Sequence, residues 1–206
     1  FISIWAVMIV MISMESVRQA NSKTVHNAEI RRKAFITNDL FPAFEAVGNI
    51  MNLTFVPYGN AQIDMDAKTV TCQHGDTECS ANTYEQCAIY KNPATADHLP
   101  FVNCLSSKGS AQLRLNSTFE ECATSAGLDF DQIKACHDDE DLAWSLQVEF
   151  AGLTPDDHQY TPWVVLDGEV YESEDFLGDL CKAYVKNGGK APKGCPEATK
   201  LRCMKD

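Results

Sequence analysis

The arrangement of the cysteines constrains the fold of this chain more than any other feature of its sequence. All nine cysteines lie at or after position 72 of the 206 residues. The first three belong to the pattern C-Q-H-G-x-x-E-C-x-x-N-x-x-x-x-C, which contains Cys72, Cys79, Asn82 and Cys87. These spacings do not suit a zinc ribbon, so they favour disulfides formed in an oxidising compartment.

We expect eight cysteines to be paired and one to stay free, because their number is odd. The free one is expected to be Cys203, whose thiol would be available for a disulfide-linked dimer. Local helical settings favour the pairs Cys122–Cys136 and Cys181–Cys195, although spacing cannot derive connectivity. The cysteines expected in disulfides are Cys72, Cys79, Cys87, Cys104, Cys122, Cys136, Cys181 and Cys195.

Two glycosylation sequons agree with an oxidising compartment. Asn52 and Asn116 each begin an N-x-[ST] acceptor. A sequon alone is a weak signal, but together with the cysteines these two predict a secreted glycoprotein. The lysosome is the alternative location.

The charge balance excludes one class of partner. Lys and Arg number 17 against 29 Asp and Glu, a formal net charge of -12, which repels nucleic acid over most of the surface. With 45% hydrophobic residues, the chain is expected to be globular and to form one domain over residues 1–206. The acidic run from His137 to Asp141 lacks the spacing of a calcium loop, so we expect a helix start there and neither a metal nor a cofactor.

The first twelve residues are apolar almost throughout. Phe1 to Ile12 is too short to span a membrane, which needs about 20 residues. It has no basic leader and no small-residue cleavage site after it, so we expect a signal peptide to lie upstream in the precursor. A continuous run containing Val, Ile and Trp predicts a buried central strand instead.

The rest of the chain divides into three regions with different residue patterns. A helical stripe including Ile30 and Phe35, followed by a strand at Leu53–Tyr58, predicts a parallel strand pair joined by a helix. Residues 69–153 carry six cysteines and short amphipathic stretches, which predicts helices joined by disulfides. The Asp167-Gly168 pair between two apolar segments predicts a hairpin, followed by a last helix over residues 174–186.

Several motifs resemble one known family. The cysteine pattern, the segment Val56–Ala61, and His158 with Tyr160, Pro162, Trp163 and Val164 are similar to the gamma-interferon-inducible lysosomal thiol reductases (GILT). The resemblance implies an α/β, thioredoxin-like fold, with its core at about residues 1–68 and 154–190 and a disulfide-stapled helical insertion at about 69–153. It also implies that Pro162 is a cis proline facing the active site and that Thr161 pairs with an extended peptide.

The sequence departs from this family where the reactive dithiol is expected. Members carry C-x-x-C after the first strand, but this sequence contains no C-x-x-C. One alignment places Arg18 and Asn21 at those positions, and another places Glu29 and Arg32 there. A guanidinium, an amide or a carboxylate cannot form the mixed disulfide that a thiolate forms, so we expect no enzymatic activity.

These observations lead to a first functional hypothesis. It is a secreted, non-catalytic scaffold that binds a protein or peptide beside Thr161 and Pro162, or through the basic segment from Arg18 to Arg32. The alternative is a thiol-disulfide oxidoreductase that uses other cysteines, such as a labile pair within residues 69–153 or Cys203 acting in trans.

Overall fold

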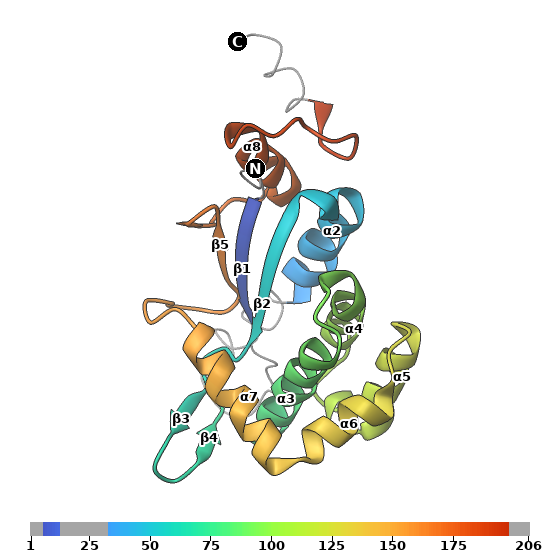
Figure 1. Cartoon of the computed structure of the whole chain (residues 1–206), viewed down its shortest axis with the longest axis vertical. Coiled ribbons are helices and arrows are strands. Elements are labelled where there is room, and N and C mark those ends of the chain that lie inside the picture. The colour runs from blue at the N-terminus through green and yellow to red at the C-terminus, as the bar shows by residue number, and fades with distance from the viewer. Residues whose placement is uncertain (1–5, 13–32, 198–206) are drawn as a thin grey trace.

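The chain folds into a mixed sheet with helices packed around it (Figure 1). The computed structural model describes residues 6–12 and 33–197. Its strands are β1 (Ala6–Ile12), β2 (Met51–Pro57), β3 (Gln62–Asp64), β4 (Thr69–Thr71), β5 (Trp163–Leu166) and β6 (Glu169–Val170). Its helices are η1 (Phe35–Leu40), α2 (Phe41–Val47), η2 (Gly48–Ile50), α3 (Asp76–Lys91), α4 (Thr95–Ser107), η3 (Gln112–Arg114), α5 (Asn116–Ser125), α6 (Phe130–Asp138), α7 (Glu140–Leu153) and α8 (Phe176–Lys186).

The main sheet has the strand order β2-β1-β5-β6. The strand β1 is parallel to β2, with Ala6 opposite Met51, and antiparallel to β5, with Met11 opposite Trp163. The expectation of a central strand ending at Ile12 is confirmed, and so is the parallel pair joined by helix. This order places the start of β5 beside the end of β1.

The connection from β1 to β2 contains the helices η1 and α2. Ile36, Leu40 and Val47 are fully buried on the inner face of this pair. Pro42 lies where η1 runs into α2, between residues with helical dihedrals, and it offers no backbone N–H to the helix. The chain therefore passes from the π-helical η1 into α2 without leaving the core.

Helices α3 to α7 gather below and to the right of the sheet in Figure 1. The helix α3 is buried along most of its length, including the polar residues Asn82 and Gln86. Fully buried Phe101, Leu105 and Ile133 come from the helices around it and share its core. A helix covered on several sides does not need one apolar stripe, and α3 has none.

Four of the strands form two hairpins, β3 with β4 and β5 with β6. The hairpin of β5 and β6 turns at Asp167 and Gly168, both with positive φ, as predicted from this residue pair. The last predicted helix is α8. A second hairpin, β3 with β4, was not predicted, and it projects at the lower left of Figure 1.

Eight cysteines form four disulfides: Cys72–Cys79, Cys87–Cys136, Cys104–Cys122 and Cys181–Cys195. The expected pair Cys181–Cys195 is present. The expected pair Cys122–Cys136 is wrong, because α3 packs against α6 and α4 packs against α5. Each of these two cysteines therefore meets a partner on a helix earlier in the chain.

Candidate functional site

A cavity of about 670 Å³ lies beside Pro162, and we call it the Pro162 groove. Three segments contribute its walls: η1 with the residue before it, the turn that enters β5 together with β5 itself, and the segment that follows β6. The peptide bond between Thr161 and Pro162 is cis. The residues that line the groove are Ala34, Phe35, Asp39, Tyr160, Thr161, Pro162, Val164, Tyr171, Glu172, Ser173 and Glu174.

Aromatic contacts fix the groove to the core. The rings of Phe35 and Tyr171 meet the buried ring of Phe176 edge-on, with centroids 5.2 and 5.5 Å away. The ring of Tyr160 contacts Trp163 at 4.9 Å. The backbone N–H of Tyr171 donates to the carbonyl of Val164 at 2.8 Å, which extends the β5–β6 pairing. The groove is therefore built on the sheet and does not depend on a free loop.

The groove is acidic. Asp39, Glu172 and Glu174 line it, and none of the lining residues within the described part of the chain is basic. Burial raises the pKa of the Asp39 carboxyl above its usual range. Burial raises the pKa of Tyr171 to about 12; the side chain of Ser173 acts in the opposite direction, and the charges of Asp179, Asp39 and Asp175 add to the rise.

One asparagine connects the groove to the cysteine pattern. Nδ2 of Asn60 donates to Oε1 of Gln73 at 2.8 Å, next to Cys72. Oδ1 of Asn60 lies 3.0 Å from Nε2 of His158, two residues before Tyr160 in the groove. Nδ1 of His158 donates to the carbonyl of Pro155 at 2.8 Å, which fixes the ring. Asn60 thus joins three of the motifs recognised in the sequence.

The C-Q-H-G loop carries the Cys72–Cys79 disulfide into the start of α3. Cys79 is half-buried in the first turns of this helix, whereas Cys72 is only 6% exposed. Glu78 is fully buried and accepts hydrogen bonds from the backbone N–H and Nδ1 of His74, at 2.7 and 3.1 Å. Burial lowers the pKa of His74. The loop is therefore held from inside by a carboxylate.

Polar side chains on α3 fix this helix to the end of β2. Nδ2 of Asn82, the asparagine of the cysteine pattern, donates to the carbonyl of Tyr58 at 3.3 Å. Nε2 of Gln86 donates to the carbonyl of Pro57 at 2.9 Å. Buried amides that satisfy buried carbonyls in this way fix the position of α3 relative to the sheet.

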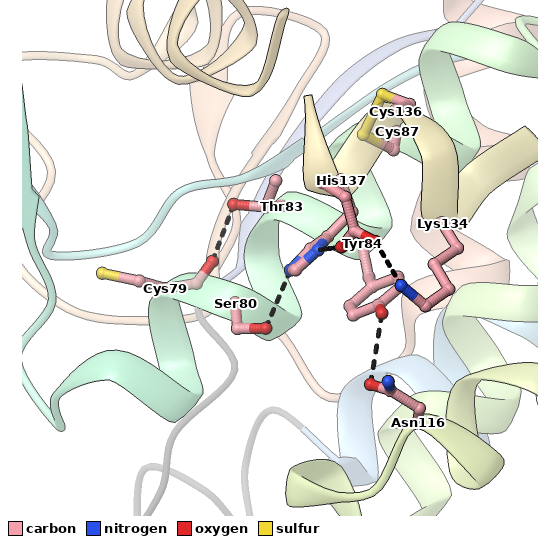
Figure 2. Close-up of polar contacts among 10 residues, drawn as sticks. Cys79, Ser80, Thr83, Tyr84, Cys87, Asn116, Lys134, Cys136 and His137 are labelled. Carbon is pink, nitrogen blue, oxygen red and sulfur yellow. Dashed lines mark hydrogen bonds and ion pairs between the residues drawn. A yellow bond between two sulfur atoms is a disulfide. The ribbon is translucent and has the colours of Figure 1, made fainter. Parts of the chain in front are cut away.

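A second polar cluster joins α3 to α6. Figure 2 shows Ser80 and Tyr84 on α3 turned toward His137 on α6. Nε2 of His137 lies 2.9 Å from Oγ of Ser80, and Nδ1 lies 2.9 Å from Oδ1 of Asp138, which also pairs with Lys134. The rings of Tyr84 and His137 stack with centroids 4.0 Å apart. Beside the Cys87–Cys136 disulfide, the cluster acts as a contact between the two helices.

Comparison with known proteins agrees with these motifs. Residues 30–126 match the family model described as gamma interferon inducible lysosomal thiol reductase (GILT). A gamma-interferon-responsive lysosomal thiol protein of Arabidopsis thaliana is 31% identical over 176 residues, covering 81% of this chain and 71% of that protein. This chain belongs to the GILT family. The gamma-interferon-inducible lysosomal thiol reductase of Mus musculus is 32% identical over 167 residues, 78% of this chain and 65% of the mouse protein.

Family membership corrects one expectation. We expected a chain without enzymatic activity, but GILT relatives from Mus musculus and Carassius auratus are named thiol reductases, and reductases are enzymes. The fish protein is 28% identical over 185 residues, 82% of this chain and 69% of its own length. The expectation that this GILT chain is not an enzyme is therefore wrong. It relied on the dithiol positions alone.

The predicted site residues fall into three groups. Thr161 and Pro162 line the groove. Asn52 on β2 and Asn116 at the start of α5 are both exposed. The alternative positions for the lost dithiol and the expected free cysteine lie outside the described residues: Arg18, Asn21, Glu29, Arg32 and Cys203.

Sequence reasoning missed the acidic residues of the groove. The signal was present after the hairpin, where Glu172, Ser173 and Glu174 follow Tyr171 in the sequence. In the described ranges, no group of three acidic, histidine or cysteine side chains is placed to hold a metal ion. No helix in the same ranges has the length and apolar character needed to cross a bilayer.

Proposed function

We propose that this GILT-family protein is a thiol-disulfide oxidoreductase that binds an extended polypeptide in the Pro162 groove. The observation that carries the proposal is the Asn60 bridge, which joins the groove segment at His158 to the loop of the Cys72–Cys79 disulfide. The polypeptide backbone would pair with Thr161, and a disulfide of the polypeptide would be exchanged with cysteines of this chain.

The same proposal includes a thioredoxin-like core at about residues 1–68 and 154–190, with residues 69–153 as the helical insertion of a single domain. Support comes from the parallel pair of β1 and β2, the antiparallel β5 and β6, and a cis proline at the entry to β5. In this arrangement the proline lies next to the end of β1, because Trp163 is opposite Met11.

The Cys72–Cys79 pair fits the reactive role best among the four disulfides. Among the described residues that line the groove there is no cysteine, so in this proposal the reacting sulfur comes from another part of the chain. Cys79 and Cys104 are the half-buried partners, whereas the other paired cysteines are buried. Only Cys79 lies in the first turns of a helix, where the helix dipole stabilises a thiolate.

The exchange needs an external dithiol to reduce Cys72–Cys79 first. The Cys79 thiolate then attacks one sulfur of the substrate disulfide, which forms a mixed disulfide and releases one substrate thiolate. The Cys72 thiolate attacks the Cys79 sulfur, which releases the second substrate thiolate and restores the disulfide seen in the structure. Two electrons pass from the external dithiol to the substrate, and its two protons go to the substrate thiolates.

We further propose that the chain works in the secretory route, either outside the cell or in the lysosome, and that both sequons carry glycans. Oδ1 of Asn116 accepts a hydrogen bond from the hydroxyl of Tyr84 at 3.3 Å. A glycan attaches through the other amide atom, Nδ2, so this contact is compatible with glycosylation. Asn52 is exposed on β2, the edge strand of the sheet.

Reduction of insulin by the full chain, with a dithiol as reductant at acidic and neutral pH, tests the activity. We expect turnover that stops when the reduced protein is alkylated. In a trapping experiment, Cys72→Ser keeps the Cys79 thiol and should accumulate a mixed disulfide with the substrate. Cys79→Ser should trap none.

These two variants control for each other, because both lose the same disulfide and therefore the same stabilisation. Cys104→Ser controls for the loss of a different half-buried cysteine, and it should retain turnover. Equal trapping by Cys72→Ser and Cys79→Ser would reject Cys79 as the nucleophile. Turnover that is insensitive to alkylation would reject the oxidoreductase itself.

A further inference from the structure

We propose that the Pro162 groove selects polypeptides with a basic side chain, arginine above lysine, next to the segment that lies along Thr161. This inference rests on the proposed function, since it names the substrate class of the same groove. It concerns which polypeptide binds and not how the disulfide is exchanged.

The first argument is uncompensated charge. Asp39, Glu172 and Glu174 line the groove, and within residues 33–197 no cation forms an ion pair with any of them. Lys182 on α8 is already used by Asp179 at 2.7 Å and by Asp175 at 3.7 Å, and Lys33, next to the lining residue Ala34, donates to the carbonyl of Ser107 at 2.9 Å. A ligand that carries positive charge would neutralise an acidic wall that the described protein leaves open.

The second argument is the half-buried position of Asp39. This carboxylate has lost part of its hydration, which raises its pKa. A partly desolvated carboxylate gains more from a cation than an exposed one does, because the effective dielectric constant is lower. Asp39 would therefore gain most from an ion pair with the ligand, while the exposed Glu172 and Glu174 would attract a basic ligand from solution.

The third argument is the hydroxyl of Tyr171. Its oxygen is buried in the wall of the groove beside the side chain of Ser173, and within residues 33–197 it makes no hydrogen bond of normal length and angle. Buried hydroxyl oxygens normally accept or donate a hydrogen bond. A guanidinium has five N–H donors and no acceptor, so it can donate to this oxygen and to a neighbouring carboxylate at once. An ammonium group is a point charge and suits this geometry less well.

The fourth argument is the apolar part of the groove. Phe35, Tyr160 and Pro162 provide rings and a flat apolar surface beside the acids. The aliphatic stem of an arginine packs on such surfaces, and its guanidinium stacks on aromatic faces. An acidic ligand would meet three like charges in the same space, which provides discrimination as well as affinity.

Fluorescence anisotropy with short labelled peptides tests this selection. The peptides have the same sequence and contain no cysteine, and they differ in one central residue, Arg, Gln or Glu. We expect the Arg peptide to bind about five- to tenfold more tightly than the Gln peptide at low salt, with the difference reduced at high salt. The Glu peptide should bind most weakly.

Matched variants assign the effect to the groove. The double variant Glu172→Gln, Glu174→Gln should lose most of the preference for Arg. The double variant Glu120→Gln, Glu149→Gln changes the net charge equally, at two acids that do not line the groove, and should keep the preference. A preference that survives in the groove variant would overturn the proposed selection.

The outcomes separate the two proposals. Equal binding of the Arg and Gln peptides overturns the selection, but leaves the polypeptide groove in place. No binding of any peptide overturns the groove as a polypeptide site, and the selection with it. Because no peptide contains sulfur, none of these results depends on disulfide exchange.

Discussion

The helical part of the molecule, residues 76–153, and the sheet part that carries the Pro162 groove are stabilised in different ways. Two disulfides join helices within the helical part, and a third closes the loop that enters it. The sheet part has one, Cys181–Cys195. The helical part also buries amides that bond to one another, while the sheet part opens into a cavity. Within the described residues, most disulfides and buried side-chain hydrogen bonds therefore lie in the helical part and not in the part that forms the groove.

The largest effect on stability is expected from the Cys87–Cys136 disulfide. It spans 49 residues, whereas Cys181–Cys195 spans 14. Loop-closure entropy gives a loss of about 4 kcal/mol for the double variant Cys87→Ala, Cys136→Ala, and about 3 kcal/mol for Cys181→Ala, Cys195→Ala. Urea unfolding measures both. A larger loss at Cys181–Cys195 would mean that the sheet part depends more on its single disulfide.

The next effect concerns the buried amides of the helical part. Nε2 of Gln147 donates to Oγ1 of Thr83 at 2.7 Å, and its Oε1 accepts from Gln86 at 3.3 Å. Gln147→Ala leaves buried polar groups without partners, so we expect a loss of about 1–3 kcal/mol. The exposed Gln132→Ala on α6 is the control and should cost less than about 0.5 kcal/mol. Equal losses would show that the buried contacts add nothing.

A smaller effect of opposite sign is expected in the groove. Tyr171→Phe removes a buried hydroxyl that makes no hydrogen bond of normal geometry within residues 33–197 and has only Ser173 beside it, so the free protein should gain up to about 1 kcal/mol in stability. The same variant should bind the Arg peptide less tightly, because the acceptor is gone. Thermal unfolding and anisotropy measure the two quantities. A lower stability of the variant would show that the Tyr171 hydroxyl already makes a stabilising interaction in the free protein.

The smallest effect is expected from pH, and it arises in the helical part. His98 on α4 is buried, which lowers its pKa, although its contact with the Asn92 carbonyl at 2.8 Å and the charge of Asp97 act in the opposite direction. The unfolded chain therefore takes up the proton first. The stabilising contribution is present above about pH 6.5 and is lost as the pH falls through this value toward the lowered pKa of the folded state.

The variant His98→Asn removes the titrating group and tests this sign. Unfolding free energies at neutral and mildly acidic pH should show a smaller decrease for the variant than for the wild-type chain. His74 has the same sign of shift and remains in both proteins, so part of the decrease should persist. An identical decrease in both proteins would exclude His98 as a source.

The parts of the fold that follow local rules could be predicted from the sequence. The central strand ending at Ile12, the turn at Asp167 and Gly168 and the helix α8 each have a strong local signal. These features depend on hydrophobic runs, backbone dihedrals and apolar periodicity, which neighbouring residues determine.

The parts of the fold that depend on tertiary packing could not be predicted from the sequence. The helix α3 shows no periodic stripe because it is covered on several sides, so its extent was not predicted. Cys122 pairs with Cys104 because α5 packs on α4, and spacing does not contain that information. The acids of the groove come from η1 and from the segment after β6, which are far apart in sequence. Thr161 and Pro162 were found because their motif is contiguous.

The single amide of Asn60 has a consequence for how this family diverges. It donates to Gln73 on one side and contacts the ring of His158 on the other, so a substitution here disturbs both neighbours. Lineages that substitute this position should carry compensating substitutions at the other two, and the three positions should covary across an alignment. A substitution in one of the three motifs would then persist only when the other two motifs change to match it.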